Sequence, residues 1–334
     1  MSIVTELSQT KDVYAQAAER KWVLPCICSE NLTTTEAILD ATQDYAATHG
    51  IPDMPCIIAI TCNYSHRNQA SNYTATRDWK TGLKLFVNDI KTLAGQDGPY
   101  KDLRVMIHLD HIQHDTDIEL LNGNLSDFAS IMYDASSLPF EQNIEKTARF
   151  VERRGKEILI EGACDEIIDA GGQTHNELTT PENAKRYITE TGVDLIVANL
   201  GTEHRASAKD LKYDGQAARR IKEQIGTKIV LHGASSVPND QIKNLFADGI
   251  CKVNIWTALE RDSTPALFYH MVKNSVKVAG INCVERLIQE GLLTPKCIDD
   301  KKADLKYFTT VYRQDIIFNE MKQIVKAYYN LWYR

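Results

Sequence analysis

Val105-Met106-Ile107-His108-Leu109-Asp110-His111 predicts a short buried strand that ends in an acid and an imidazole side by side. Parallel α/β sheets and barrels place their chemistry at the carboxyl ends of their strands, so this polar pair predicts the mouth of such a fold. Two more histidines, His204 and His232, follow strand-like runs farther along the chain. Three histidines at strand ends are enough to hold a catalytic metal with one position left open.

Apolar runs that resemble strands alternate with helix-like segments along most of the chain. The ends of these runs are spaced by roughly thirty residues, which is the size of one βαβ repeat. Two helix-like segments, 181–190 and 238–247, begin with a proline, the residue favoured in the first turn of a helix. Strict alternation with eight strands predicts an α/β fold, a closed (β/α)8 TIM barrel. The predicted strands cover residues 22–28, 55–62, 103–109, 128–134, 157–162, 194–200, 228–231 and 250–255.

Three stretches of the sequence are additional to the strands and helices that a minimal barrel needs. Residues 63–80 are polar and predict a long loop over the mouth, and residues 163–178 contain paired glycines and predict a mobile loop. The tail, 282–334, is helical in pattern and rich in aromatic residues. We therefore predict a barrel over residues 1–281 and a helical C-terminal extension over 282–334, packed on the barrel or at a subunit interface. On this basis we expect a homodimer or a homotetramer.

Composition excludes several classes of function. The net charge of -7 and the lack of a long basic cluster argue against a nucleic-acid partner. No apolar run approaches the ~20 residues of a membrane span, so we expect no membrane partner. The N-terminal stretch has no signal-like pattern, and several of the eight cysteines lie in apolar runs, as buried thiols do. We expect a cytoplasmic protein with reduced thiols.

A single histidine is more often structural than a metal ligand, and position is what favours these three. His111, His204 and His232 each follow a predicted strand, so barrel geometry places them on the same rim. Adjacent side chains diverge along a strand, so we expect Asp110 to act as an acid or base and not as a further ligand beside His111. The alternative for Asp110 is to cap a helix over residues 115–123.

Two glycine- and serine-bearing turns predict a second function for the same rim. Residues 231–238 join a predicted strand to a helix, and residues 253–257 end the last strand. The last two βα loops of α/β barrels commonly cradle a phosphate with backbone N–H groups and helix N-termini. The alternative is ordinary helix capping by serine and threonine.

Five segments, taken together and in order, resemble class II, zinc-dependent ketose-bisphosphate aldolases, which include the fructose- and tagatose-bisphosphate enzymes. The resemblance covers roughly residues 10–280. The segments are His108-Leu-Asp-His, Tyr133-Asp-Ala-Ser-Ser-Leu-Pro-Phe-Glu-Gln-Asn-Ile, Gly192-Val-Asp-Leu-Ile-Val-Ala-Asn-Leu-Gly-Thr-Glu-His, His232-Gly-Ala-Ser-Ser-Val-Pro and Lys252-Val-Asn-Ile-Trp-Thr.

This resemblance implies a TIM barrel whose zinc ion (Zn2+) is held by three histidines, with Asp110 as the proton-transfer acid. It implies a phosphorylated sugar substrate and a monovalent cation near the phosphate. A carboxylate of the mobile loop, Glu166 or Asp169, would move the donor's carbon-bound proton. The implied zinc ligands are His111, His204 and His232. The implied phosphate-binding residues are Gly201, Gly233, Ser235, Asn254 and Thr257.

The chain departs from the family pattern around the substrate and not at the histidines. The pattern has a second glutamate where this chain has Ala163, and a histidine where it has Ser137. Arg205 stands where the pattern has glycine, and it either grips a second anionic group of the substrate or faces outward. Two further departures lie next to the predicted phosphate site, at Trp256 and Ala258. We therefore expect an altered substrate and an unaltered reaction class.

The predicted function is that of a zinc-dependent aldolase, a lyase of carbohydrate metabolism. It would cleave or form a ketose phosphate from a donor of the dihydroxyacetone-phosphate type and an aldehyde. One alternative is a different zinc reaction at the same site, such as hydrolysis by a zinc-activated water. The other is a barrel that has lost activity and serves as a binding or regulatory protein.

Overall fold

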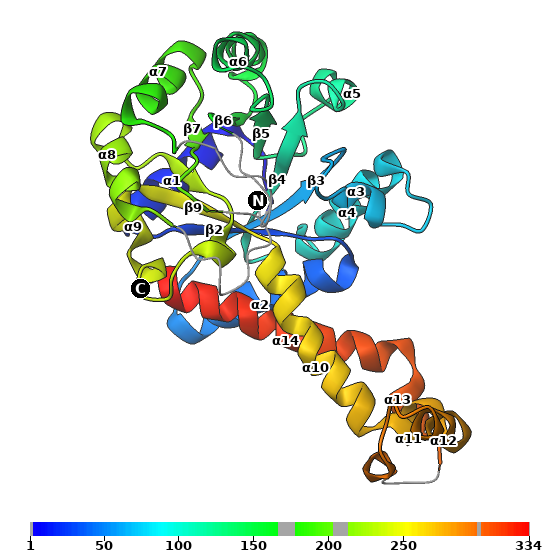
Figure 1. The fold of residues 1–334 in the computed structure, drawn as a ribbon. Helices are drawn as coiled ribbons and strands as arrows, with labels where there is room; N and C mark the ends of the chain where they lie inside the picture. The colour runs from blue at the N-terminus through cyan, green and yellow to red at the C-terminus, as the bar shows by residue number, and fades with distance from the viewer. Residues whose placement is uncertain (1–2, 166–177, 203–212, 299–301, 334) are drawn as a thin grey trace.

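Eight parallel strands hydrogen-bond in a closed ring in the computed structural model, which describes residues 3–165, 178–202, 213–298 and 302–333 (Figure 1). The ring order is β4-β3-β2-β9-β8-β7-β6-β5, and pairing of β5 with β4 closes it. The strands are β2 (Leu24–Cys28), β3 (Pro55–Thr61), β4 (Arg104–Gln113), β5 (Ser130–Asp134), β6 (Leu159–Ala163), β7 (Leu195–Val197), β8 (Ile229–Leu231) and β9 (Ile250–Ile255). The predicted (β/α)8 barrel is therefore confirmed.

One strand of the structure was not predicted. The two-residue strand β1 (Ile3–Val4) pairs in parallel with Val105 and Met106 at the beginning of β4. The same edge of β4 pairs with β5 only from His108 onward. Strand β1 therefore lies at the amino-terminal end of the barrel, where β4 has not yet met β5. Two residues are too few to show a periodic pattern, so the sequence gives no signal for this strand.

Helices cover the outside of the barrel between successive strands, except the first helix, α1, whose Leu7 and Tyr14 pack on a buried cluster formed by β5 to β9 (Figure 1). Asn31 begins one of them by accepting a hydrogen bond from the backbone N–H of Thr34, and Thr180 ahead of Pro181 begins another in the same way. The helices before the last strand are α1 (Leu7–Glu19), α2 (Leu32–His49), α3 (Gln69–Asn72), α4 (Trp79–Ala94), α5 (Ile118–Asn122), α6 (Phe140–Arg154), α7 (Pro181–Thr191), α8 (Gly215–Ile225) and α9 (Leu245–Asp248). Helix α3 lies inside the stretch 63–80, which was predicted to be a loop throughout.

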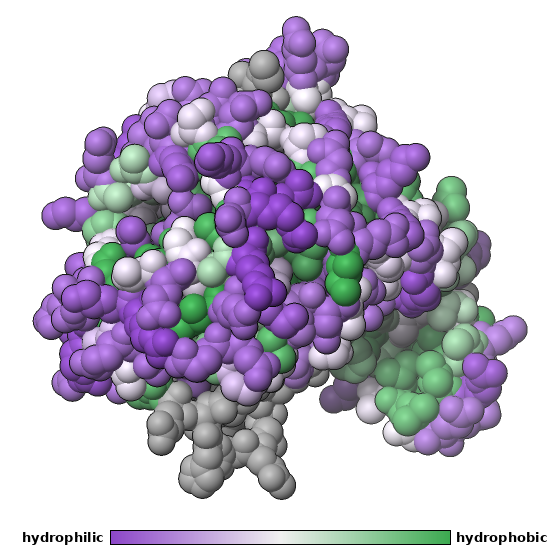
Figure 2. Space-filling model, turned by 90° about the horizontal axis from the view of Figure 1, so that it is seen from above, coloured by the Kyte–Doolittle hydropathy of each residue, from purple (hydrophilic) through white to green (hydrophobic). Residues whose placement is uncertain are grey.

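The helices after β9 leave the barrel and return to it. Helix α10 (Thr257–Lys273) runs outward to α11 (Ser275–Ala279), α12 (Ile281–Gln289) and α13 (Leu305–Phe308), and α14 (Thr310–Trp332) runs back beside it (Figure 1). We call the projecting part, residues 268–311, the arm. Figure 2 shows hydrophobic surface gathered on this lobe. The exposed large apolar side chains of the arm are Phe268, Tyr269, Leu292, Leu305, Phe308 and Val311.

The end of the chain packs back onto the barrel. Trp22 stacks on Tyr333 with ring centroids 4.5 Å apart, and the hydroxyls of Thr42 and Tyr329 lie 2.6 Å apart. Within the described residues, no helix is long and apolar enough to cross a lipid bilayer.

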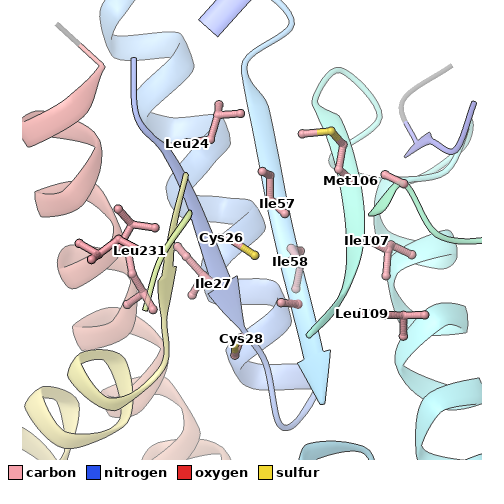
Figure 3. Close-up of a cluster of buried hydrophobic side chains, with 14 of the residues drawn as sticks. Leu24, Cys26, Ile27, Cys28, Ile57, Ile58, Met106, Ile107, Leu109 and Leu231 are labelled. Atoms are coloured by element: carbon pink, nitrogen blue, oxygen red, sulfur yellow. The ribbon is translucent and has the colours of Figure 1, made fainter. Parts of the chain in front are cut away.

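The core lies between the strands and the surrounding helices. Strands β2 and β3 are buried at every position, as expected for parallel strands that are covered on both faces. Figure 3 shows side chains of β2, β3 and β4 in one buried cluster, among them Ile27, Ile58 and Ile107. This continuous burial explains why the strands read as unbroken apolar runs in the sequence.

Candidate active site

Two histidines and one aspartate converge at the mouth of the barrel. His111 Nε2 lies 3.0 Å from His232 Nδ1, and one ligand atom from each of Asp110, His111 and His232 lies within 4.8 Å of the others. All three side chains are buried. In the part of the chain that the structure describes, this is the only such group able to hold a metal ion. The third predicted ligand, His204, lies outside the described residues.

The backbone at His111 corrects two expectations about β4. The strand was predicted to end at Leu109, but it continues to Gln113, with a shift of register against β5 between Leu109 and Ile112. His111 sits in this irregularity with a left-handed φ of 46°. Because the regular alternation is broken there, Asp110 and His111 both face the mouth, and the expectation that their side chains diverge is wrong.

The alternative role for Asp110 as a helix cap is also excluded. Asp110 lies inside β4, and the next helix begins at Ile118 with Asp117 at its N-cap position. The carboxylate of Asp110 is held by two other side chains. Its Oδ1 accepts a hydrogen bond of 2.8 Å from Asn254 Nδ2, and its Oδ2 accepts one of 3.5 Å from the thiol of Cys28.

A carboxylate behind His111 orients the imidazole. His111 Nδ1 donates a hydrogen bond of 2.8 Å to Asp134 Oδ2, which leaves Nε2 to face His232. Burial alone would raise the pKa of Asp134, but hydrogen bonds from His111 and Ser136 hold it well below its ordinary value. The ring of Tyr64 stacks in parallel on that of His111, with centroids 4.1 Å apart. A metal-bound histidine commonly has such a carboxylate partner on its other nitrogen.

These residues fit a zinc ion. Two nitrogen ligands at about 2.0–2.1 Å from a tetrahedral zinc lie roughly 3.3 Å apart, close to the separation of His111 Nε2 and His232 Nδ1. Imidazole nitrogens backed by a carboxylate are a common donor set for zinc. The site would take its third nitrogen from His204, as the sequence predicts.

A charged network fills the barrel interior near the mouth, and sequence reasoning missed it. Lys252 Nζ lies 2.8 Å from Glu161 Oε1 and 3.2 Å from His108 Nε2, with all three side chains fully buried. They come from β9, β6 and β4, which are not neighbours in the ring, so their contacts cross the interior. The signal was present, because Lys252 and Glu161 each interrupt an apolar strand.

This network has a defined protonation pattern. Burial alone would lower the pKa of Lys252, but the carboxylates of Glu161 and Asp110 raise it, so the ammonium stays charged. Burial and the charge of Lys252 hold the pKa of His108 well below its ordinary value. His108 is therefore neutral, accepting from Lys252 at Nε2 and donating to Ser130 Oγ, 2.8 Å away, at Nδ1.

Four of the five residues predicted to bind phosphate line one cavity with the convergent histidines and Asp110. Gly233 has a left-handed φ of 68° that turns the chain into Ala234–Ser236, and Thr257 is the first residue of α10. These four residues are Gly233, Ser235, Asn254 and Thr257. The fifth, Gly201, is not among the described residues that line this cavity. Asn254 was predicted to bind phosphate, and in the structure its side-chain amide donates a hydrogen bond to Asp110.

Arg67 lines this cavity and belongs to a group of charged side chains that the sequence did not reveal. Arg67 makes a two-pronged hydrogen bond to Glu30, and its guanidinium lies 4.9 Å from the centre of the Trp256 ring. Burial, together with the charge of Glu30, raises the pKa of Glu260 to about 7. Glu30 and Arg67 come from separate βα loops and Glu260 from α10, so no local pattern could have grouped them. The predicted residues Arg205, Glu166 and Asp169 lie outside the described residues.

Comparisons with known proteins match most of the chain. Residues 8–332 match the family model described as class-II fructose-bisphosphate aldolase. The chain is 30% identical over 272 residues to the D-tagatose-1,6-bisphosphate aldolase subunit GatY of Klebsiella oxytoca, covering 79% of this chain and 86% of that protein.

Two solved structures share the fold at lower identity. The fructose-bisphosphate aldolase of Campylobacter jejuni superposes with a TM-score of 0.77 at 17% identity, covering 99% of this chain and 96% of that one. The YdjI aldolase of Escherichia coli K12 superposes with a TM-score of 0.63 at 17% identity, covering 99% of this chain and 97% of that one.

Proposed function

This chain belongs to the class II fructose-bisphosphate aldolase family and is an aldolase of the lyase class, and on that premise we propose that it is a zinc-dependent ketose-phosphate aldolase. The observation that carries the proposal is the convergence of His111 and His232 beside Asp110 at the barrel mouth. His111, His204 and His232 would hold the metal. Zinc, when bound, supplies a Lewis acid for the oxygens of the ketone donor.

Asp110 is the group that we propose moves the hydroxyl proton. In cleavage it accepts the proton of the alcohol that becomes the aldehyde, and the electrons of the broken carbon–carbon bond stay with the donor half. The hydrogen bonds from Asn254 and Cys28 hold the carboxylate in one orientation for this transfer. A second acid then protonates the donor carbon. We propose Glu166 or Asp169 for that step.

The donor's phosphate would bind in the cavity lined by Gly233, Ser235, Asn254 and Thr257. Backbone N–H groups at the beginning of a helix favour an anion, and Thr257 opens the 17-residue helix α10. Gly201 would complete this cradle from the neighbouring βα loop. Arg205 would either grip a second anionic group of the substrate or face outward, and the relative turnover of ketose monophosphates and bisphosphates distinguishes these two roles.

The direct experiment measures triose phosphate released from ketose phosphates by the zinc-loaded protein. We expect release that a chelator abolishes and that added zinc restores, because the histidines hold the metal in a reversible site. If the zinc-loaded protein cleaves no ketose phosphate, the chain is better explained as a binding or regulatory barrel.

We also propose that the arm contacts a second copy of the chain. The exposed apolar side chains of residues 268–311 gather on one projecting lobe (Figure 2). Monomeric proteins rarely leave a large apolar patch in water. A homodimer or homotetramer that buries the arm would remove this exposure.

A further inference from the structure

A second cavity adjoins the first at the metal ligand His111. Its volume is about 110 Å³, and it is lined by Tyr64, Ser65, His66, Gln113 and residues of β5 and β6 with the loops that follow them. Tyr64 and His111 line both cavities, so the two spaces meet beside the stacked pair. A cleaved ketose phosphate has two halves, and only the donor half carries the phosphate assigned to the first cavity.

Two departures from the family pattern shape this second cavity. Ala163, at the end of β6, and Ser137, after β5, both line it, where the pattern has a glutamate and a histidine. Both replacements shorten the side chain and remove a titratable group. The resulting space approaches the ~150 Å³ of protein cavities that admit a benzene-sized molecule. It can therefore hold a small hydroxyaldehyde fragment.

The walls of this cavity carry hydroxyl, amide and carboxylate groups. Among the described residues, no lysine or arginine lines it. Asp134 is engaged by His111 and Ser136, and Asp165 accepts a hydrogen bond of 2.5 Å from the Thr179 hydroxyl. Two imidazoles, those of His66 and His111, also line the cavity, and His111 Nε2 faces the proposed metal site. A phosphate or carboxylate that is placed away from the metal, against Asp134 and Asp165, would face two carboxylates, which disfavours binding.

Neutral hydroxyl groups match these walls better. Carboxylates accept hydrogen bonds from sugar hydroxyls, and the hydroxyl of Ser137 can donate or accept. The amide N–H groups of Gln113 bind His111 O and Asp134 Oδ2, and its Oε1 can accept. Selection against charge would therefore come from the two aspartates, while the small side chains at positions 137 and 163 leave room for the carbon chain.

We propose that the second cavity binds the aldehyde half of the substrate and selects an uncharged hydroxyaldehyde. The enzyme would then cleave ketose 1-phosphates in preference to ketose 1,6-bisphosphates. This inference rests on the aldolase function proposed above. In the cleavage, the hydroxyl proton goes to Asp110, the carbon–carbon bond breaks, and its electron pair stays with the donor half. Protonation of the donor carbon by the second acid, proposed above as Glu166 or Asp169, then gives dihydroxyacetone phosphate beside the neutral aldehyde.

The test compares kcat/KM for fructose and tagatose 1-phosphates with their 1,6-bisphosphates, using the zinc-loaded enzyme. We expect a preference of about tenfold or more for the 1-phosphates. The Ser137→Arg variant adds a cation to the cavity and should shift the preference toward the bisphosphates by a similar factor. Ser126→Arg makes the same chemical change on an exposed loop and should leave the ratio unchanged.

A binding measurement tests the same preference for 1-phosphates over bisphosphates in a protein that does not turn them over. Calorimetric titration of the zinc-loaded Asp110→Asn protein should show tighter binding of the 1-phosphates than of the bisphosphates. If the enzyme releases triose phosphate and a bisphosphate is the best substrate, this inference is overturned while the aldolase function stands. Release from neither class overturns the aldolase function and this inference with it.

Discussion

Asn254 Nδ2 donates a hydrogen bond of 2.8 Å to Asp110 Oδ1 and thereby ties the end of β9 to β4 inside the mouth. These two strands are separated in the ring by β2 and β3, so the contact spans the opening. It holds the proposed proton-transfer group against a residue that was predicted to bind phosphate. We therefore expect substrate binding and proton transfer to be linked through this one amide.

Asp110→Asn should keep the fold and the zinc but lose ~10²–10⁴ in turnover, the usual scale for a lost acid or base. Exchange of the donor's carbon-bound proton with solvent should survive better than cleavage, because a different acid handles that proton. Metal analysis, a coupled triose-phosphate assay and the exchange rate measured by NMR check this. Loss of zinc, or near-normal turnover, would contradict the assignment.

His232→Ala and His111→Ala should each lose the metal, because two remaining imidazoles make a poor zinc site. The wild-type protein should carry about one zinc per chain. His270→Ala is the matched control, since His270 lies on α10 and contacts Tyr312. Metal analysis after dialysis decides the matter, and full zinc content in either variant would exclude that histidine as a ligand.

Lys252→Met should destabilise the fold by about 3–5 kcal/mol, because it leaves Glu161 buried without its partner. The double variant Lys252→Met/Glu161→Gln should recover much of that loss, since no unpaired charge remains. Urea unfolding measures both. A double variant as unstable as the sum of its single variants would show that the pair is not coupled.

Glu260→Gln should make stability less dependent on pH. The pKa of Glu260 is raised from an ordinary 4.5 to about 7, so the folded state disfavours the ionised group. This penalty is absent below pH 4.5 and fully present above pH 7. The variant should therefore match the wild type near pH 4 and exceed it by about 1–2 kcal/mol at pH 8, after allowance for partial exposure. Urea unfolding at both pH values tests the sign.

Phe268→Glu should weaken self-association without unfolding the barrel. The side chain is 70% exposed within one chain, so its replacement should change the stability of the isolated chain by less than about 0.5 kcal/mol. Light scattering coupled to size exclusion measures the mass. Leu32→Glu is the control, because Leu32 is an exposed apolar residue outside the arm. An unchanged oligomer in the Phe268 variant would remove this residue from the interface.

The strands of the barrel were predictable because each is buried on both faces and reads as an apolar run. The convergence of His111 and His232 was predictable for a related reason, since parallel strands bring their carboxyl ends to one rim. The direction of the Asp110 side chain was not predictable, because no residue type in β4 signals the shift of register at this point. The Glu30–Arg67 pair was also hidden, because it joins loops that only the closed ring brings together.

The left-handed backbone of His111 has a consequence for anyone who would transplant this site. Copying the histidines and the aspartate onto the regular strands of another barrel would send the two adjacent side chains to opposite faces. The left-handed backbone at His111 must be copied with them, together with Asp134 of β5, which binds the imidazole through Nδ1. A grafted site would therefore need the irregular backbone of this segment as well as its residue types.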